Sequence, residues 1–573
     1  MSSSHESSSQ SSATVTEPER GRDVEAQKPR QELSYYKRQF DQAGVTQAVL
    51  EYKYRGSGTN DDPFIVDFLP GDPKNPMEFP QWKKWGITVL QAIAVLAVTF
   101  VSTAYSGGIG AIIEDFKCGE EIAILGISLF VLGFAIGPLV WAPLSETYGR
   151  QILFFFTYVA LTAFNAGAAG SQNIWTLIIL RFFAGTFGSS PLTNSGGVIA
   201  DMFTAKDRGL ATALFATAPF LGPSIGPIAG GFLGVAGGWR WVEGLMACFT
   251  GLLCILCCLM VPETYAPTLL RKRAAKLSQI TKKVYASKID VGRPKKSVTE
   301  EFKIALSRPW IMLILEPIVL LTSLYMAIVY GTLYMMFAAF PIVFQQYRGW
   351  SPGIGGLAFL GIAVGMIVAV TYSVWDNKRY ANTLKASGGN APAEARLPPA
   401  LVGSILLPVG LFWFAWTCGP EIHWIVSIIA SAFFAAGLVL VFLSLMNYMI
   451  DSYVIYAASV LAANSVLRSI FGAAFPLFTT AMYNNLGIHW ASSIPAFLAV
   501  LCLPFPFLFY KYGAAIRMKC KFAAEAAEVL ERMRAKNHDD GKPGPGPSSG
   551  SPPATAPPEE PEKAPEAAQM EKS

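Results

Sequence analysis

Residues 218–231 read A-P-F-L-G-P-S-I-G-P-I-A-G-G. Three prolines and four glycines in fourteen residues would destabilise a helix in water. Within a membrane bundle, neighbouring helices satisfy the backbone groups that proline leaves free, and glycines let a second helix approach closely. Because the stretch lies inside a long apolar run, we interpret it as a bendable membrane helix with a flat packing face.

The rest of the chain has the composition of a polytopic membrane protein. Of its 573 residues, 52% are hydrophobic and only 15% are charged, although both ends are polar. A helix that spans a membrane needs about 20 apolar residues. Windows of that length predict an all-α polytopic membrane protein with twelve transmembrane helices, near 87–106, 122–142, 152–170, 174–196, 209–235, 242–262, 311–340, 353–375, 398–418, 422–447, 455–482 and 489–510.

The distribution of charge predicts how these spans are arranged. The basic stretch 264–308 divides them six and six, which is typical of secondary transporters built from two similar bundles around a central path. Loops on one side carry nineteen Lys and Arg against three on the other, so the positive-inside rule places both termini in the cytosol. The predicted parts are a disordered cytosolic tail (1–34), a cytosolic pre-membrane segment packed under the membrane domain (35–84), an N-terminal six-helix bundle (85–263), a basic cytosolic loop (264–308), a C-terminal six-helix bundle (309–512) and a cytosolic, largely disordered tail (513–573).

Several classes of function are excluded by the sequence. No G-x-x-x-x-G-K-[ST] motif occurs, and no soluble segment is long enough for a nucleotide-binding domain, which excludes ATP-driven transport by this chain alone. The four His are scattered without metal-ligand spacing, so we expect no metal site, no cofactor and no enzyme activity. The net charge of +5 gives no support for binding to nucleic acid.

Ionisable side chains inside the predicted spans are candidates for proton coupling, because each costs roughly 2.5–3.5 kcal/mol on insertion scales. Arg181 lies in the fourth span, where it either responds to the protonation of a nearby acid or serves as a structural hydrogen-bond donor. Glu316 is the only carboxylate well inside a predicted span. It is either a proton carrier or, because it precedes Pro317 near the cytosol, a solvated acid at a helix end. Glu243 falls at the edge of the sixth span, so its role stays ambiguous.

Two spans carry side chains that we assign to a substrate cavity. Arg468 follows Asn464 by one helical turn in the eleventh span, so both polar groups project from one face, which looks into the bundle or into a watery cavity. Aromatic residues recur at helical spacing in the seventh span, a face that suits flat or amphipathic organic substrates and cations. Helix packing is the alternative in a chain with 13% aromatic residues. The predicted cavity residues are Tyr325, Tyr330, Tyr334, Phe337, Asn464 and Arg468.

Together these patterns resemble the major facilitator superfamily, and within it the fungal branch of twelve-span drug:proton antiporters. The resemblance covers about residues 50–512. The loop A-P-L-S-E-T-Y-G-R at 142–150 is similar to a loop motif that acts in the family as a cytoplasmic latch between the halves, and it contains Glu146, Gly149 and Arg150. Arg181 matches a fourth-span Arg that the family associates with proton coupling. The fifth span is similar to the motif typical of antiporters at Gly222, Pro223, Gly226, Pro227, Gly230 and Gly231.

The resemblance implies a transporter with the major facilitator fold, whose two bundles rock around a central cavity. It implies import of protons and export of an amphipathic organic compound. Its partners would be protons, a small-molecule substrate and the lipid bilayer, with a plasma-membrane location and a monomer as the working unit. Three alternatives stay open: a dedicated exporter of one endogenous secondary metabolite, glycolipid or polyamine; an uptake facilitator; and a non-transporting membrane sensor. The antiporter-type fifth span favours export over uptake.

Overall fold

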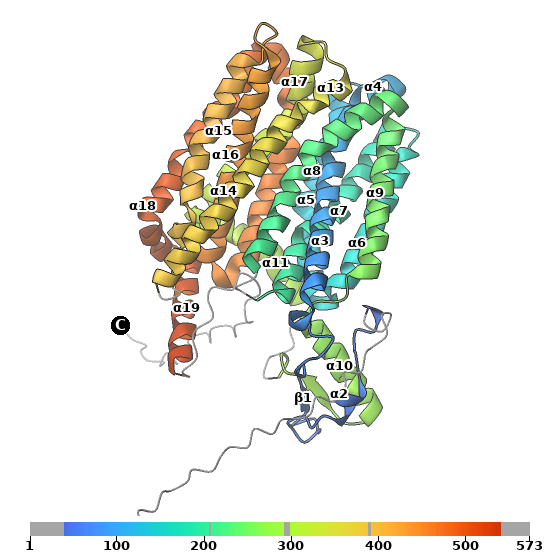
Figure 1. The fold of residues 1–573 in the computed structure, drawn as a ribbon, viewed down its shortest axis with the longest axis vertical. Helices are drawn as coiled ribbons and strands as arrows, with labels where there is room; N and C mark the ends of the chain where they lie inside the picture. The colour runs from blue at the N-terminus through green and yellow to red at the C-terminus, as the bar shows by residue number, and fades with distance from the viewer. Residues whose placement is uncertain (1–38, 205–207, 292–297, 388–390, 540–573) are drawn as a thin grey trace, which may run out of the picture.

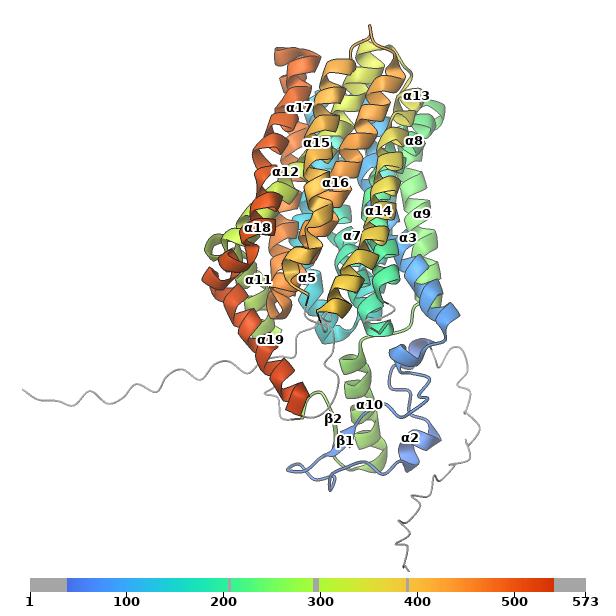
Figure 2. The same cartoon turned by 60° about the vertical axis from the view of Figure 1, so that its left-hand side comes forward.

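A computed structural model describes residues 39–204, 208–291, 298–387 and 391–539. Two helical bundles lie side by side, and a small layer of helix and strand lies beneath the N-terminal bundle (Figure 1). We call this layer the basal layer, the end of the bundles that it adjoins the basal end, and the opposite end the distal end. The C-terminal helix α19 (Lys521–Asp539) projects from the same basal end (Figure 2).

The N-terminal bundle contains six long helices whose backbone bonds are made within each segment, as an apolar surrounding requires. A 3-10 turn, η2 (Tyr105–Gly108), and the short helix α4 (Ile109–Phe116) connect the first of them to the second. The six are α3 (Gln81–Ala104), α5 (Glu120–Tyr148), α6 (Arg150–Ala169), α7 (Ile174–Met202), α8 (Arg208–Gly237) and α9 (Trp239–Met260).

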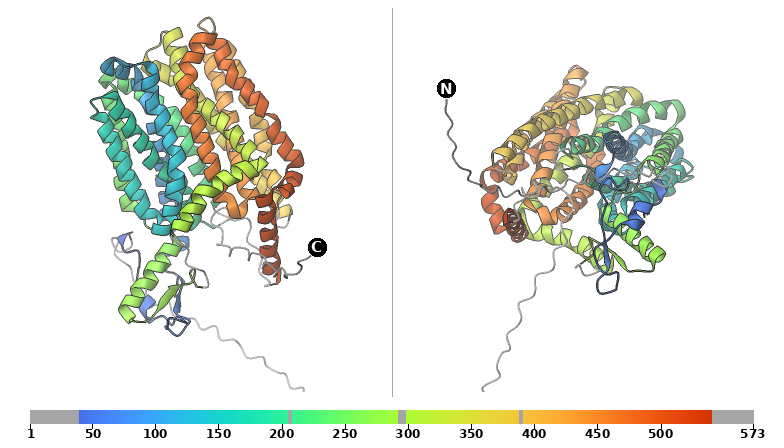
Figure 3. Two further views of the ribbon diagram at one scale, coloured as in Figure 1. Left: turned by 180° about the vertical axis from the view of Figure 1, so that it is seen from behind. Right: turned by 60° about the horizontal axis from the view of Figure 1, so that its bottom comes forward.

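The C-terminal bundle begins with α11 (Val298–Leu315), which Figure 3 shows in yellow-green running obliquely toward the bundle from the basal side. α12 (Pro317–Phe340) follows after a break at Glu316, and ends in a π-helical turn, η3 (Pro341–Tyr347). The remaining helices are α13 (Pro352–Leu357), α14 (Phe359–Ala386), α15 (Pro398–Thr417), α16 (Trp424–Ser452), α17 (Ala457–Cys502) and α18 (Pro504–Lys519), with 3-10 turns η4 (Ala393–Arg396) and η5 (Val454–Tyr456).

Ten stretches of the described chain are long and apolar enough to cross a membrane. The last of them, Val454–Lys519, contains two helical segments, because α17 turns at Gly487, whose φ of 74° is not helical. α7, a helix of 29 residues that is not among the ten, packs against α5 and α6 within the N-terminal bundle. The ten stretches, the second segment after Gly487 and α7 together make twelve membrane-length helical segments in the described chain, six in each half. This number agrees with the predicted fold class.

Some predicted boundaries are corrected by the structure. The first span, predicted at 87–106, begins earlier because α3 starts at Gln81. The span predicted at 311–340 is two helices, because the residue before a proline is driven away from the helical region and Glu316 is extended (φ −111°, ψ 98°). The tail predicted from 513 onward continues as α18 and α19 as far as Asp539. The predicted tail 1–34 and residues 540–573 lie outside the described residues.

The basal layer is formed by residues 39–80 and 261–291, so the pre-membrane segment packs largely against part of the basic loop. Strand β1 (Phe64–Val66) pairs in parallel with β2 (Tyr285–Ser287), beside α2 (Gln47–Glu51), the 3-10 turn η1 (Pro76–Glu78) and α10 (Ala266–Thr281). Arg273 and Asp72 form an ion pair that is 1% and 4% exposed. A small core of its own lies between the two segments: Val49, Val66, Leu270, Ala274 and Leu277.

Candidate functional site

A buried ion pair in the N-terminal bundle joins Arg181 of α7 to Glu243 of α9. Arg181 Nη1 and Glu243 Oε1 lie 3.1 Å apart, and the two side chains are 0% and 1% exposed. Arg181 also donates hydrogen bonds to three backbone carbonyls, those of Gly126 (2.8 Å), Val101 (3.1 Å) and Ser102 (3.4 Å). Glu243 Oε2 has no hydrogen-bond partner among the described residues, so this oxygen is free to take a proton.

Two aromatic rings shield the pair from water. The Arg181 guanidinium lies 4.3 Å from the centre of the Tyr105 ring and 5.0 Å from that of Phe130, where the negative ring faces attract a cation. Tyr105 is itself fixed, because its hydroxyl donates to the carbonyl of Ala123 at 2.9 Å. In this low-dielectric setting, a change of charge on Glu243 has a large effect on Arg181.

The ion pair is connected to the C-terminal half through α3. Arg181 binds the carbonyls of Val101 and Ser102 near the distal end of that helix. The hydroxyl of the same Ser102 shares a hydrogen bond of 3.0 Å with the hydroxyl of Tyr334 on α12, and both side chains are fully buried. A continuous path of contacts therefore runs from Glu243 to the interface between the two halves.

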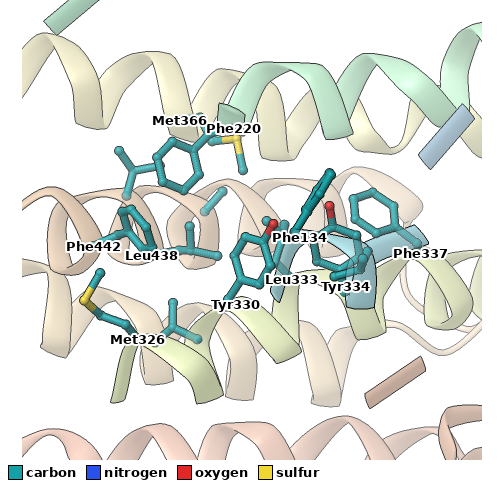
Figure 4. Close-up of a cluster of buried hydrophobic side chains, with 14 of the residues drawn as sticks. Phe134, Phe220, Met326, Tyr330, Leu333, Tyr334, Phe337, Met366, Leu438 and Phe442 are labelled. Atoms are coloured by element: carbon teal, nitrogen blue, oxygen red, sulfur yellow. The ribbon is translucent and has the colours of Figure 1, made fainter. Parts of the chain in front are cut away.

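Aromatic side chains from both halves meet at this interface, and we call them the aromatic layer: Phe134, Phe220, Tyr330, Tyr334, Phe337 and Phe442 (Figure 4). Along α12, the rings of Tyr330 and Tyr334 are 4.9 Å apart, and those of Tyr334 and Phe337 are 5.4 Å apart. Phe220 of α8 meets Phe442 of α16 edge to face across the halves at 4.9 Å. The predicted aromatic face of the seventh span thus lies at the interface between the two bundles.

Arg468 of α17 adds a positive charge to one side of the aromatic layer. Its guanidinium lies 4.8 Å from the Tyr330 ring and 5.1 Å from the Phe442 ring, and its Nε has no hydrogen-bond partner among the described residues. Asn464, one turn earlier, is 2% exposed, and its Oδ1 is likewise unpaired there. Polar groups held without full partners beside aromatic rings are suited to bind a ligand that supplies the missing hydrogen bonds.

Two predicted site residues lie apart from this layer. Tyr325 of α12 is fully buried and lies close to Cys502. Cys502 belongs to the part of α17 that follows the turn at Gly487. Glu316 is fully buried at the start of α12, where its carboxylate accepts hydrogen bonds from the Tyr453 hydroxyl and from the backbone N–H of Phe522, each at 2.8 Å. Glu316 therefore ties the seventh span to the C-terminal helix α19, and the structure does not bring it to Arg181.

The glycines of the fifth-span motif let α8 pack closely on two helices. A β-carbon at Gly222 or Gly226 would lie 2.5 Å from the carbonyl oxygen of Leu96 or 2.8 Å from the backbone nitrogen of Ala104, and one at Gly230 would meet the Ala104 carbonyl. Gly231 faces the other half, where a β-carbon would lie 2.6 Å from the carbonyl oxygen of Pro352 on α13. The motif thus joins α3 on one side to the distal end of the C-terminal bundle on the other. Pro223 and Pro227 lie within the same helix, α8.

The predicted latch residues lie at the basal end, between α5 and α6. Gly149 has a φ of 102°, and a β-carbon there would clash with the Glu263 carboxylate, so only glycine fits. That carboxylate accepts the backbone N–H of Arg150 at 3.0 Å. Arg150 also donates to Ser145 Oγ at 2.7 Å and lies 3.6 Å from Asp201. These contacts hold the basal ends of α5, α6 and α7 together, while Glu146 is exposed on the last turn of α5.

Tyr265, which precedes α10, lies under the guanidinium of Arg150, with 4.9 Å between Arg150 Cζ and the ring centre. Burial raises the pKa of Tyr265 to about 12, so the phenol stays neutral at physiological pH. Among the residues that the structure describes, no group of three or more His, Cys, Asp or Glu is placed to hold a metal ion.

Sequence reasoning did not assign Glu243, which the structure shows to be the partner of Arg181. The signal available in the sequence was a charged residue near the start of the sixth predicted span. Because that span was predicted at 242–262, Glu243 fell at its edge, where a carboxylate can stay in contact with water. The two residues are 62 positions apart in the sequence, so only the packing of α7 and α9 on the same two neighbours, α3 and α6, brings them together.

Two six-helix bundles, an ion pair buried in one of them and an aromatic layer between them define a secondary transporter. The chain belongs to the Major Facilitator Superfamily, whose family model matches residues 91–476. It is therefore a transporter and not an enzyme, and the predicted family is confirmed.

Three similar proteins come from fungi. The chain is 63% identical to the MFS-type efflux pump MFS2 of Trichophyton rubrum over 88% of its length and 85% of that protein. It is 62% identical to the major facilitator superfamily multidrug transporter mdrA of Aspergillus fumigatus, over 88% of this chain and 83% of that one. The citrinin biosynthesis cluster MFS transporter mrr1 of Monascus ruber is 42% identical over 81% of this chain and 93% of its own. These relatives confirm the predicted fungal efflux branch.

A solved structure of the same fold is the partially occluded, inward-open xylose transporter XylE from E. coli. It aligns with a TM-score of 0.54 over 75% of this chain and 98% of its own, at 16% sequence identity. At that identity the similarity shows the fold alone.

Proposed function

We propose that this transporter expels amphipathic organic compounds from the cytosol in exchange for protons, by alternating access. The observation that carries the proposal is the contact path from Glu243 through Arg181 and Ser102 to Tyr334. It connects a carboxylate with one unpaired oxygen to the layer where the two halves meet. The names of the most similar relatives, an efflux pump and a multidrug transporter, support the direction of transport.

In this proposal Glu243 carries the proton, and Arg181 responds to the change in the charge of Glu243. When Glu243 is ionised, Arg181 is held by the carboxylate and by the carbonyls of α3. When Glu243 is protonated, the guanidinium has lost its counter-charge in a site that excludes water, and its interactions with α3 must change. Because Ser102 of α3 contacts Tyr334, that change reaches the interface between the halves. Glu316, the acid proposed from the sequence, serves in this scheme as a fixed link to α19.

The aromatic layer is the proposed substrate site. Rings from both halves offer flat apolar faces, and Arg468 and Asn464 offer a charge and hydrogen-bonding groups beside them. A drug-sized amphipathic molecule with a polar end would replace the contacts that now join Phe220 to Phe442 and Ser102 to Tyr334. Substrate binding and proton binding therefore act on the same contacts.

Alternation requires the distal contacts between the halves to open. In this structure they are closed, because Gly231 of α8 packs on Pro352 and the hydroxyl of Thr480 donates to Glu120 at 3.2 Å. The flat glycine face of the fifth span is the proposed sliding surface, and the loop with Glu146, Gly149 and Arg150 the proposed latch at the basal end.

Accumulation of labelled organic compounds in inside-out vesicles tests this function. We expect an imposed pH gradient to drive accumulation by the wild type, and Arg181→Ala and Glu243→Gln to abolish this drive. Glu121→Gln is the matched control, because Glu121 is an exposed carboxylate at the distal start of α5, and it should transport as the wild type does. Accumulation that ignores the gradient in the wild type would show a facilitator and overturn the coupling.

A dedicated exporter of one endogenous metabolite is the second candidate. The relative named for a citrinin biosynthesis cluster favours it, and the layer residues suit either role. Competition in the same vesicles separates the two: a broad exporter is inhibited by many unrelated amphiphiles, a dedicated one by a single compound class. We further propose a plasma-membrane location, cytosolic termini and a monomer as the working unit. Fluorescent tagging and sizing of the purified protein test these points.

A further inference from the structure

The N-terminal bundle contains a cavity that is separate from both the ion pair and the aromatic layer. It has a volume of about 640 Å³ and lies at the basal end, between α3, α6, α7 and α9, with residues 40–43 and α10 closing it from below. Small-molecule sites typically measure roughly 300–1,000 Å³. The cavity is thus large enough for a drug-sized ligand.

The basal wall of the cavity offers a ligand one cation that forms no ion pair with a carboxylate among the described residues. Its charged residues are Arg150, Lys272 and Asp41. Arg150 is neutralised by Asp201, 3.6 Å away. Asp41 Oδ1 is occupied by the backbone N–H groups of Ala43 and Gly44, at 3.1 and 3.3 Å.

Lys272 is the cation that remains for a ligand in this wall. Its Nζ donates to the neutral Oε1 of Gln42. A carboxylate in place of that amide oxygen would form a charge-assisted hydrogen bond, which is about twice as strong as one to a neutral acceptor.

The opposite wall has unpaired hydrogen-bonding groups. Gln91 of α3 and Asn194 of α7 line the cavity and are each 1% exposed. Gln91 accepts from Ser195 at 2.6 Å and Asn194 donates to Ser190 at 3.0 Å, yet Gln91 Nε2 and Asn194 Oδ1 have no partner among the described residues. A buried donor and acceptor without partners are costly, and a hydroxyl or amide group would satisfy both.

Apolar side chains separate the two polar walls, among them Phe154, Val198 and Cys257. Phe203 directly follows the last residue of α7, and its ring contacts that of Trp85 on α3, with 5.6 Å between the ring centres. Trp85 therefore lies level with the basal end of α7. Gln91 lies six residues beyond Trp85, so it stands roughly 9 Å deeper in the bundle at 1.5 Å per helical residue. The cavity therefore matches a molecule with two polar ends and an apolar body.

We propose that this cavity is a second small-molecule site, which binds an organic anion of drug size with its anionic group on Lys272 and a hydroxyl or amide on Gln91 and Asn194. The acyl chain of a lipid fits less well, because its apolar end would leave the two amides unpaired. The cavity lies at the basal end, which the proposed topology places on the cytosolic side. It needs no proton coupling, and its test is binding rather than transport.

The probe is para-linked hydroxybiphenylcarboxylic acid, measured by calorimetry on the purified full-length chain in nanodiscs of zwitterionic lipid. We expect Lys272→Gln to weaken its binding about tenfold. Lys276→Gln is the matched control, because Lys276 is exposed one turn further along α10, and should have no effect. The methyl ester of the probe, which lacks the negative charge, should bind Lys272→Gln as tightly as it binds Lys276→Gln. Biphenylcarboxylic acid, which lacks the hydroxyl, should bind the wild type less tightly.

Equal binding of the acid to the wild type and to Lys272→Gln would overturn the proposal, as would equal losses in the two lysine variants. Loss of binding in nanodiscs of anionic lipid would identify a lipid headgroup as the occupant and would also overturn it.

Two native thiols on α9 give a readout that does not depend on any substitution. Cys258 lines the cavity, whereas Cys248 is exposed elsewhere on the same helix. We expect the acid to slow maleimide labelling of Cys258, followed by mass spectrometry, and to leave Cys248 unchanged. Labelling of Cys258 that is indifferent to saturating acid would place the ligand outside the cavity.

Discussion

Replacing Glu243 with leucine removes the carboxylate that neutralises Arg181. Deleting one partner of a buried ion pair destabilises a protein by about 3–5 kcal/mol. Arg181 would keep its hydrogen bonds to the carbonyls of Gly126, Val101 and Ser102, so its donors stay largely satisfied. We therefore expect the lower end of the range, about 3 kcal/mol, which corresponds to a shift of roughly 150-fold in the folding equilibrium.

Glu243→Gln separates stability from coupling. Glutamine keeps the volume of the side chain and an acceptor for Arg181 Nη1, now 3.1 Å from Glu243 Oε1, so we expect a smaller loss of about 1–2 kcal/mol. It cannot release a proton. Accumulation driven by a pH gradient should therefore be lost, while exchange of substrate at equal pH on both sides should persist.

The double substitution Arg181→Met with Glu243→Leu completes the test. Replacing a buried ion pair by apolar residues of similar volume is often neutral for stability, so the double variant should melt near the wild type and well above Glu243→Leu, while it transports without coupling. The assays are thermal melting of the purified protein and uptake by inside-out vesicles with and without the gradient. Gradient-driven accumulation by Glu243→Gln at the wild-type level would show that Glu243 does not carry the coupled proton.

Three further substitutions probe the other contacts. Tyr334→Phe removes the hydrogen bond to α3 but keeps the ring, so gradient-driven accumulation in vesicles should fall about two- to tenfold with little change in melting temperature. Gly231→Val places a branched side chain against the carbonyl of Pro352, so the distal contacts should open, measured as faster hydrogen exchange in α13. Arg273→Met removes the ion-pair partner of the buried Asp72, which should destabilise the basal layer by about 3–5 kcal/mol, seen as faster proteolysis of that layer with export retained.

The number of bundle helices and their division into halves were predictable, because a bilayer forces apolar segments into helices. The predicted fifth span at 209–235 becomes α8 (Arg208–Gly237) with nearly the same bounds. The basal layer was less predictable. Strands β1 and β2 have three residues each and lie more than 200 residues apart, so no local pattern marks their pairing.

The candidate site could be predicted only where one helix carries the signal. The aromatic face of the seventh span was visible, because Tyr330, Tyr334 and Phe337 share one face of α12. Glu316 was visible as an acid inside a predicted span, and Pro317 indicated a helix end as one alternative. Its burial there, with hydrogen bonds from Tyr453 and Phe522, depends on distant parts of the chain and was not visible. Contacts between helices, such as the one that makes Glu243 the partner of Arg181, follow from packing and leave no pattern in a single sequence.

The contacts that transmit the coupling must together be strong enough to match the free energy that one proton supplies. One charge moved across 100 mV supplies about 2.3 kcal/mol, whereas a single neutral hydrogen bond contributes about 0.5–1.5 kcal/mol. The bond between Ser102 and Tyr334 is thus too weak to transmit the whole driving force. The rest must pass through α3 as a rigid body, because Arg181 holds two of its carbonyls and the glycines of α8 pack on the distal part of the same helix. Coupling should therefore be sensitive to the fit between α3 and α8 as well as to the ionisable residues themselves.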